Sequence, residues 1–140
     1  NEKPEPAEGE DSLMGRYILA AEDNELNAEI LMELLKMAGA ECDWVENGQR
    51  ALERFEESAP DKYDMILMDV QMPVMDGYEA TRRIRSCPHP RAKDIPIIAM
   101  TANAFSEDVR DALEAGMNEH VAKPVDMDRL KAAVKQLLER

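Results

Sequence analysis

Four short apolar runs in this chain each end at polar side chains that could take part in chemistry. Glu22 and Asp23 follow the first run, Asp69 ends the second, and Thr101 and Lys123 close the third and the fourth. Carboxylates that lie close together either raise one another's pKa or bind a cation. Mg²⁺ prefers a few carboxylates with water molecules, and Mn²⁺ accepts the same oxygen ligands. Together with an ammonium and a hydroxyl group, such an ion could hold a phosphoryl group.

Each of these residues also has a purely structural explanation. Acids after a strand often cap the next helix, which is the alternative for Glu22 and Asp23. Asp69 could simply enter a loop, Thr101 could satisfy a turn, and Lys123 could be an exposed loop lysine. The chemical interpretation therefore depends on whether the fold brings all of them to one place.

The stretch from Tyr63 to Gly77 is the centre of the pattern. Met65–Met68 is an unbroken apolar run, too short for a helix, that suits a strand buried on both faces of a parallel sheet. Asp69 follows it, and Pro73 and Asp76-Gly77 mark a loop before the next helix. Because ligands bind at the carboxyl ends of the strands in an open α/β sheet, Asp69 is placed for chemistry.

Strands and helices are predicted to alternate along the chain. Strands are expected at Arg16–Ala21, Cys42–Val45, Tyr63–Asp69, Ile95–Thr101 and His120–Ala122. Helices are expected from Glu25 to Ala38, from Asn47 to near Pro60, from Gly77 to Arg85, from Ser106 to Gly116 and from Met127 onward. The alternation predicts an α/β fold, a flavodoxin-like (βα)5 three-layer sandwich whose parallel five-stranded sheet has the order 2-1-3-4-5. In that order the four strands that carry the polar residues are neighbours.

The first predicted helix and two aromatic residues complete the structural expectations. Apolar residues recur at every fourth position in this helix, at Leu26, Ile30, Leu34 and Ala38, with Leu31 and Leu35 beside them, which predicts an amphipathic helix. His89 lies between Pro88 and Pro90 and is interpreted as a solvent-exposed loop residue. Trp44, near the end of an edge strand, is expected to be partly buried under a helix rather than to bind a ligand.

Composition limits the function classes that remain. The chain has 140 residues, enough for one domain, and its 17 basic and 30 acidic residues give a net charge of −13. That charge argues against nucleic acid or an anionic membrane surface as a direct partner. Cys42 and Cys87 have no metal-binding spacing, which favours a reducing, cytoplasmic location.

The start of the chain differs in composition from the rest. Residues 1–14 carry prolines and acids with almost nothing apolar, so they are expected to form a flexible acidic linker or tail ahead of a folded domain over residues 15–140. The chain begins with Asn1 rather than Met, which suggests a fragment or a processed product.

The motifs at the ends of the predicted strands resemble those of the receiver domains of two-component response regulators. The resemblance rests on Glu22-Asp23-Asn24, on Met68-Asp69-Val70-Gln71-Met72-Pro73-Val74-Met75-Asp76-Gly77, on Thr101-Ala102-Asn103-Ala104 and on Lys123-Pro124. It extends from about Arg16 to Arg140. The chain is most similar to the C-terminal receiver of a hybrid sensor histidine kinase, and a stand-alone single-domain response regulator is the alternative.

The resemblance implies a nucleophile and a metal site. Asp69 is expected to take a phosphoryl group from the phosphohistidine of a histidine kinase or of a histidine phosphotransfer domain. Asp23, Asp69 and the backbone carbonyl of Gln71 are expected to bind Mg²⁺ directly, and Glu22 through water. Lys123 is expected to pair with one phosphoryl oxygen.

The resemblance also implies residues that respond to the phosphoryl group. Thr101 is expected to move and bind a phosphoryl oxygen, with Ala102 and Asn103 beside the site, and the bond before Pro124 is expected to be cis. Many family members carry Tyr or Phe three residues before the lysine as a rotating switch, but this chain has His120. The aromatic switch is therefore not carried over, and Phe105 is the nearby aromatic residue that could take part of its role.

The expected function is that of a phosphorelay module whose own reactions are self-phosphotransfer and slow loss of the phosphoryl group. Its parent chain is expected to be a histidine kinase, and that kinase could be anchored in a membrane. A phosphohydrolase of the haloacid-dehalogenase type would need a second acid where this chain has Gln71, and a pseudo-receiver would lack the acid pair, Asp69 or Lys123. The module is expected to contact neither nucleic acid nor membrane directly, and to be a monomer or a weak dimer through its fourth helix, fifth strand and fifth helix.

Overall fold

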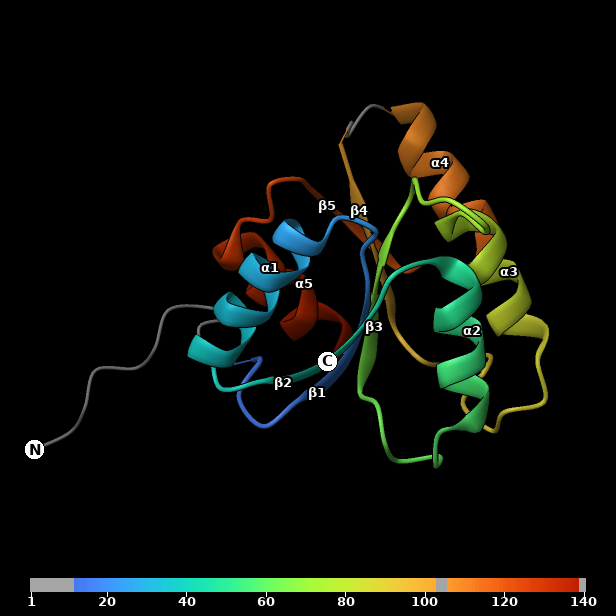
Figure 1. Cartoon of the computed structure of the whole chain (residues 1–140), viewed down its shortest axis with the longest axis horizontal. Coiled ribbons are helices and arrows are strands. Elements are labelled where there is room, and N and C mark those ends of the chain that lie inside the picture. Colours follow the sequence, from blue (N-terminus) through green and yellow to red (C-terminus); the bar gives the residue numbers. More distant parts are fainter. Residues whose placement is uncertain (1–11, 103–105, 139–140) are drawn as a thin grey trace, which may run out of the picture.

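The structure is a computed structural model that describes residues 12–102 and 106–138, with the backbone alone for 106–108, and in these residues the chain forms five parallel strands and five helices (Figure 1). The strands are β1 (Tyr17–Ala21), β2 (Glu41–Val45), β3 (Met65–Asp69), β4 (Ile97–Thr101) and β5 (Glu119–Ala122). The helices are α1 (Glu25–Met37), α2 (Gly48–Glu57), α3 (Gly77–Ser86), α4 (Ser106–Ala115) and α5 (Met127–Leu138). The sheet order β2-β1-β3-β4-β5 confirms the predicted fold.

The carboxyl ends of β1, β3, β4 and β5 lie level with one another. In the parallel register Ala21 pairs with Met68, Asp69 with Met100, and Thr101 with Ala122. Residues that follow these strands therefore emerge at one edge of the sheet. This register is what brings residues from four separate parts of the sequence together.

The helices cover both faces of the sheet, α1 and α5 on one face and α2, α3 and α4 on the other (Figure 1). Side chains of β3 alternate between the two sides: Ile66 and Met68 pack with Phe55 of α2, whereas Met65 and Leu67 pack with Leu35 of α1. This alternation follows from the two-residue period of a strand, and burial on both faces explains why the strand is uniformly apolar. Among the described helices, none combines the length and apolarity that a membrane crossing requires.

Helix α1 has two neighbouring apolar stripes, and only one of them faces the sheet. Ala28, Leu31 and Leu35 are buried, whereas Leu26 and Ile30 are 64% and 52% exposed. The residues at every fourth position are therefore not the buried face, although the helix itself is present as predicted. Residues three and four apart make up the face that packs on the core, which is the spacing of 28, 31 and 35. Helix α1 consequently presents an apolar strip to solvent.

His89 is buried, so the prediction of a solvent-exposed loop residue is wrong. Its ring packs on that of Phe55 with the two centroids 4.2 Å apart. Its Nδ1 accepts a hydrogen bond from the Arg91 backbone N–H at 3.0 Å, and its Nε2 lies 3.0 Å from the Ser58 carbonyl oxygen. Because Nδ1 accepts, Nε2 carries the proton that is donated to Ser58. The two prolines indicated a connector correctly, but the connector folds back onto α2.

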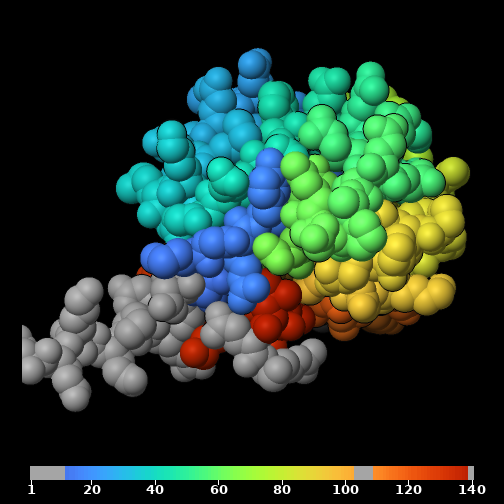
Figure 2. All heavy atoms as spheres, turned by 90° about the horizontal axis from the view of Figure 1, so that it is seen from below, coloured from blue at the N-terminus to red at the C-terminus, as the bar shows by residue number. Residues whose placement is uncertain are grey.

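The first described residues pack beside α5, where Figure 2 shows the blue start of the chain next to the red C-terminal helix. Leu13 is fully buried in the core cluster of α1 and α5, and the Ser12 hydroxyl donates to the Lys131 carbonyl oxygen at 2.7 Å. The packed unit therefore includes Ser12 and Leu13, ahead of residue 15, where the sequence placed the boundary. Residues 1–11 of the predicted tail lie outside the described residues.

Candidate functional site

Asp69 is the last residue of β3 and lies almost fully buried at the edge of the sheet, with 4% of its surface exposed. The loop that follows returns tightly, because the Gly77 backbone N–H donates to the Val70 carbonyl oxygen at 2.9 Å. A Cβ atom at Gly77 would collide with the Asp69 carbonyl oxygen, so only glycine permits this close approach. Asp76 then caps α3 by accepting from the Glu79 backbone N–H at 2.8 Å. The Asp-Gly pair thus fixes the backbone around Asp69.

Lys123 reaches the same point from the end of β5. Its backbone N–H donates to the Thr101 carbonyl oxygen at 2.8 Å, which extends the β4–β5 pairing past the strand end. Its Nζ donates to Asp69 Oδ2 at 2.9 Å and lies 3.0 Å from Glu22 Oε1. The peptide bond between Lys123 and Pro124 is cis, as expected. One ammonium group therefore bridges two carboxylates, one at the end of β3 and one directly after β1.

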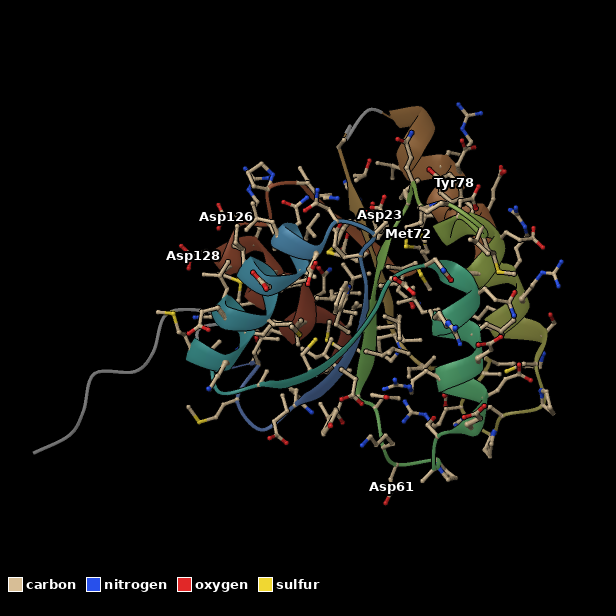
Figure 3. The ribbon with its side chains drawn as sticks, viewed as in Figure 1. Asp23, Asp61, Met72, Tyr78, Asp126 and Asp128 are labelled. Atoms are coloured by element: carbon tan, nitrogen blue, oxygen red, sulfur yellow. The ribbon has the colours of Figure 1, made fainter. Side chains whose placement is uncertain are left out.

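Glu22 and Asp23 follow β1 and differ sharply in their surroundings. Glu22 is buried, and its Oε2 accepts from the Asn24 backbone N–H at 3.0 Å, while Asn24 caps α1 by accepting from the Asn27 N–H at 2.9 Å. Asp23 is exposed and has no hydrogen bond or ion pair within the described part of the chain. Figure 3 shows Asp23 on the same side of the molecule as Met72 of the loop after β3, with Asp61 at the opposite end. Within the described residues the Asp23 carboxylate is therefore unpaired, whereas those of Glu22 and Asp69 are hydrogen-bonded.

The three carboxylates form a cluster that fits a cation. Carboxylate oxygens of Glu22, Asp23 and Asp69 lie within 4.8 Å of one another. Three negative charges next to the single ammonium of Lys123 leave a local excess of negative charge. Hard oxygen donors at such distances suit Mg²⁺ or Mn²⁺ better than a softer metal.

The electrostatics of the cluster reflect burial and this excess of charge. Burial raises the pKa of Asp69 from 3.8 to about 6, the Lys123 hydrogen bond opposes the rise, and the charge of Glu22 adds to it. For Lys123, burial favours the neutral form, but the hydrogen bonds to Asp69 and Glu22 outweigh it and raise its pKa. Lys123 therefore stays positively charged, and Asp69 is costly to ionise until further positive charge arrives.

An open cleft of about 420 Å³ lies over the cluster. The predicted site residues that line it are Glu22, Asp23, Asp69, Gln71, Thr101, Ala102 and Lys123. Thr101 is 5% exposed, and the Gln71 backbone N–H lies 3.4 Å from Asp69 Oδ1. The fold thus gathers these residues in one place. Asn103 and Phe105 lie outside the described residues.

His120 is not in this cleft. It lies half-buried on β5 with its Nδ1 3.5 Å from a Glu119 carboxylate oxygen, and it lines a separate groove with Arg129 and Gln136 of α5. Any role of His120 would therefore concern the surface of β5 and α5 rather than direct contact with Asp69.

Sequence reasoning gave no site role to three residues that line the cleft, Asn24, Asn27 and Val70. For Asn24 and Asn27 a signal was present, because an asparagine directly before a helix is a strong N-cap candidate, and its side chain accepts from the backbone N–H three residues on. The two residues joined by this capping bond both line the cleft.

Comparisons with known proteins agree with this geometry. A family model for the response regulator receiver domain matches residues 18–135. The chain is 38% identical over 127 residues to hybrid signal transduction histidine kinase L of Dictyostelium discoideum, covering 89% of this chain and 7% of that protein. It is 36% identical over 150 residues to probable histidine kinase 1 of Oryza sativa subsp. indica, covering 86% of this chain and 15% of that protein. The chain thus spans only a small part of the length of these relatives.

Solved structures give the same result over nearly whole chains. The receiver domain of a sensor histidine kinase from Pseudomonas aeruginosa PAO1, with a magnesium ion in its active-site cleft, is 37% identical with a TM-score of 0.79, covering 90% of this chain and 99% of that one. The receiver domain of a histidine kinase from Arabidopsis thaliana, complexed with Mg²⁺ and BeF₃⁻, is 30% identical with a TM-score of 0.79, covering 93% and 95%. The family match, the sheet order and the cluster at the strand ends lead to one conclusion: the chain belongs to the response regulator receiver domain family.

Proposed function

We propose that the chain is a phosphoacceptor module that takes a phosphoryl group from a phosphohistidine onto Asp69. The observation that carries this proposal is the carboxylate of Asp69, held 2.9 Å from the Lys123 ammonium within a cluster of three acids. In the transfer an Asp69 oxygen bonds to phosphorus, the phosphorus–nitrogen bond of the donor breaks, and the donor imidazole leaves with the electron pair. Hydrolysis of the aspartyl phosphate restores the carboxylate.

Mg²⁺ is the metal that this cluster is proposed to hold. Asp23 and Asp69 would bind it directly with the backbone carbonyl of Gln71, and Glu22 would act through water; Mn²⁺ would use the same oxygens. When bound, the ion supplies positive charge that offsets the negative charge of the cluster and of the phosphoryl group. The magnesium ion in the similar Pseudomonas receiver and the Mg²⁺ and BeF₃⁻ in the Arabidopsis receiver support this choice.

Lys123 and Thr101 are proposed to hold the phosphoryl group once it is attached. Lys123 is charged and already at hydrogen-bond distance from Asp69, so it can pair with a phosphoryl oxygen without a large movement. Thr101 lines the same cleft with a hydroxyl group, and Ala102 and Asn103 follow it in the chain. Movement of Thr101 toward the phosphoryl group would carry the change to the segment that leads into α4.

The proposed donor is a protein, a histidine kinase or a histidine phosphotransfer domain, rather than a small molecule. An apolar groove of about 430 Å³ adjoins the cleft and is lined by Ile30, Leu31 and Leu34 of α1 together with Pro124 and Val125. Ile30 belongs both to this groove and to the exposed apolar strip of α1, so the two surfaces are continuous at that residue. A helical partner could cover the strip while presenting its phosphohistidine to the cleft. A similar receiver, 29% identical with a TM-score of 0.76, was solved with the histidine phosphotransfer protein of Saccharomyces cerevisiae.

The main test is incubation with acetyl phosphate and Mg²⁺ followed by intact mass measurement. The wild-type protein is expected to gain a single phosphoryl group and Asp69→Asn none. Asp61→Asn is the matched control, because Asp61 lies at the opposite end of the molecule (Figure 3). Turnover of many equivalents without a labelled protein would indicate a phosphohydrolase, and absence of labelling with acetyl phosphate and with a phosphohistidine donor would indicate a pseudo-receiver.

A second test addresses the donor surface. Ile30→Lys is expected to slow transfer from a phosphohistidine donor by about tenfold or more, because it puts a charge into the apolar groove. Labelling by acetyl phosphate should stay unchanged. Met37→Lys is the control, since Met37 is also exposed on α1 but does not line the groove. Equal transfer rates for the two variants would contradict this docking surface.

The wider context is proposed by analogy. The relatives are histidine kinases many times longer than this chain, so a hybrid histidine kinase is the proposed parent and a stand-alone regulator the alternative. A kinase ATP-binding region encoded upstream of Asn1 would distinguish them, and a cytoplasmic location is proposed from that context.

The proposed oligomeric state is a monomer or a weak dimer. The exposed Leu113 of α4 and the groove between β5 and α5 that includes His120 support a weak dimer through these elements. Sedimentation at several concentrations, with and without phosphorylation, tests it against a monomer.

A further inference from the structure

Trp44 makes a hydrogen bond to the backbone of the acidic cluster. Its indole Nε1–H donates to the Glu22 carbonyl oxygen at 2.7 Å. Trp44 lies on β2, the edge strand beside β1, and it is the single tryptophan of the chain. Cys42, two residues earlier, packs with the core cluster of α1 and α5, and the two-residue period of a strand puts Trp44 on the same face. The bond therefore comes from a side chain that is neither a predicted metal ligand nor part of the cleft.

The bond completes a set of contacts that hold Glu22 on every side. The Glu22 backbone N–H donates to the Val45 carbonyl oxygen at 3.0 Å, so the end of β2 binds both the N–H and the C=O of this residue. The Glu22 side chain is held by Lys123 and by the Asn24 backbone N–H. With both backbone groups and both carboxylate oxygens engaged, Glu22 has little freedom left.

The hydrogen bond from Trp44 also restrains the next residue, Asp23. The carbonyl group that Trp44 binds belongs to the peptide unit that joins Glu22 to Asp23, and this unit is planar. Fixing its oxygen therefore fixes the direction in which Asp23 leaves the strand. Asp23 needs such support, because its own side chain has no hydrogen bond or ion pair within residues 12–102 and 106–138. The Asn24 cap holds the other side of Asp23 at the start of α1.

We propose that Trp44 is a positioning residue of the metal site, which holds the Glu22–Asp23 peptide so that the carboxylates are preset for Mg²⁺. This inference rests on the metal site of the proposed function. Loss of the indole N–H removes no metal ligand from the chain. It lets the β1–α1 turn that carries Asp23 relax, so metal binding weakens. Partners that orient metal ligands commonly affect affinity in this way.

The test compares two variants by calorimetric titration of the unphosphorylated protein with Mg²⁺. Trp44→Phe keeps an aromatic ring but loses the N–H donor, and it is expected to weaken Mg²⁺ binding by about threefold to tenfold. Tyr17→Phe is the matched control, because it removes a hydroxyl that donates to Asp43 on the same edge of the sheet and has no contact with the cluster. Each variant loses one hydrogen bond, so a purely structural role would lower the thermal stability of both and leave the Mg²⁺ affinity of both unchanged.

Two outcomes would overturn the inference. One is Mg²⁺ binding by folded Trp44→Phe within twofold of the wild type. If the variant does not fold, nuclear magnetic resonance of the ¹⁵N-labelled wild type decides, because the single indole N–H gives one resonance. That resonance is expected to exchange slowly with solvent and to shift with the Mg²⁺ titration, and one that stays still throughout overturns the inference. Absence of Mg²⁺ binding by the wild type is a different result, which would remove the metal site itself.

Discussion

The sheet carries two polar clusters, each centred on an aspartate, that use opposite charge balances. In the Asp43 cluster, made up of Asp43, Tyr17, Tyr63, Arg54 and Lys62, one carboxylate has four partners. It accepts from the hydroxyl groups of Tyr17 and Tyr63 at 3.1 and 2.7 Å, and it lies 3.6 and 3.9 Å from the Arg54 and Lys62 nitrogens. In the Asp69 cluster, made up of Glu22, Asp23, Asp69 and Lys123, three carboxylates share one ammonium.

This difference separates a structural network from a binding site. The Asp43 carboxylate is fully satisfied by its own protein, and it stabilises the edge strand β2 against the amino ends of β1 and β3. Burial and the Asp43 hydrogen bond raise the pKa of Tyr63 far above its usual value, so its phenol stays neutral and donates. The Asp69 cluster has a charge that its own protein does not balance, and it lies under an open cleft. Unbalanced charge at an accessible place is what leaves free energy for a cation and a phosphoryl group.

The largest expected effect on stability comes from removing the carboxylate at the centre of the Asp43 cluster. Asp43→Ala removes the acceptor of two hydroxyl groups and is expected to lower the free energy of unfolding by about 2–4 kcal/mol. Labelling of Asp69 by acetyl phosphate should persist, because no residue of the Asp43 cluster lines the cleft. Urea unfolding and intact mass measurement check the two parts. Asp61→Ala, an exposed loop aspartate at the same end of the molecule, is the control that should change neither; loss of labelling in Asp43→Ala would contradict the separation of the clusters.

In the Asp69 cluster, removal of the aspartate charge is expected to raise the free energy of unfolding rather than to lower it. Folding raises the pKa of Asp69 from 3.8 to about 6, so the folded state keeps a proton that the unfolded state has already released in this range. The stability from that proton is fully present below the unfolded pKa and is lost as the pH rises through about 6. Asp69→Asn carries no charge to lose, so at about pH 7.5 without Mg²⁺ it is expected to be about 1–3 kcal/mol more stable than the wild type.

The pH dependence provides the control for this prediction. The stability difference between Asp69→Asn and the wild type should shrink toward zero at about pH 4, because Asp69 is then protonated in the folded wild type. Adding Mg²⁺ at neutral pH should stabilise the wild type more than the variant. Urea unfolding at both pH values measures the difference, and an Asp69→Asn protein less stable than the wild type at neutral pH would show that Asp69 is already balanced.

The Asp69 cluster was predictable from the sequence, and the reason is topological. Each of its residues directly follows an apolar run, and the alternation of strands and helices leaves few sheet orders, so strand ends could be placed together without coordinates. The Asp43 cluster was not predictable in this way. Its members come from the middle of β2, from the first residue of β1, from α2 and from the segment before β3, and nothing local in the sequence links them. The hydrogen bond from Trp44 is hidden for the same reason.

The sequence also did not predict which face of a helix is buried. In α1 two apolar stripes lie side by side, and only packing selects Ala28, Leu31 and Leu35. In α3 the buried residues besides Ile84 are Gly77, Ala80 and Thr81, which are small rather than strongly apolar. Helix α3 packs closely through small side chains, so hydrophobicity alone underestimates its buried face.

The smallest expected effect concerns the backbone beside the Asp69 cluster. Among the described residues Val74 is the one non-glycine residue with a positive φ, 72°, and it is 81% exposed, so no buried contact compensates for this conformation. A β-branched side chain is disfavoured there, whereas asparagine is tolerated. Val74→Asn is therefore expected to raise the free energy of unfolding by about 0.5–1 kcal/mol. Val74→Thr keeps the branched side chain and should give no gain in the same urea titration. If Asn and Thr proved equal, the loop would not be strained, and the contrast between the two clusters would be one of charge alone.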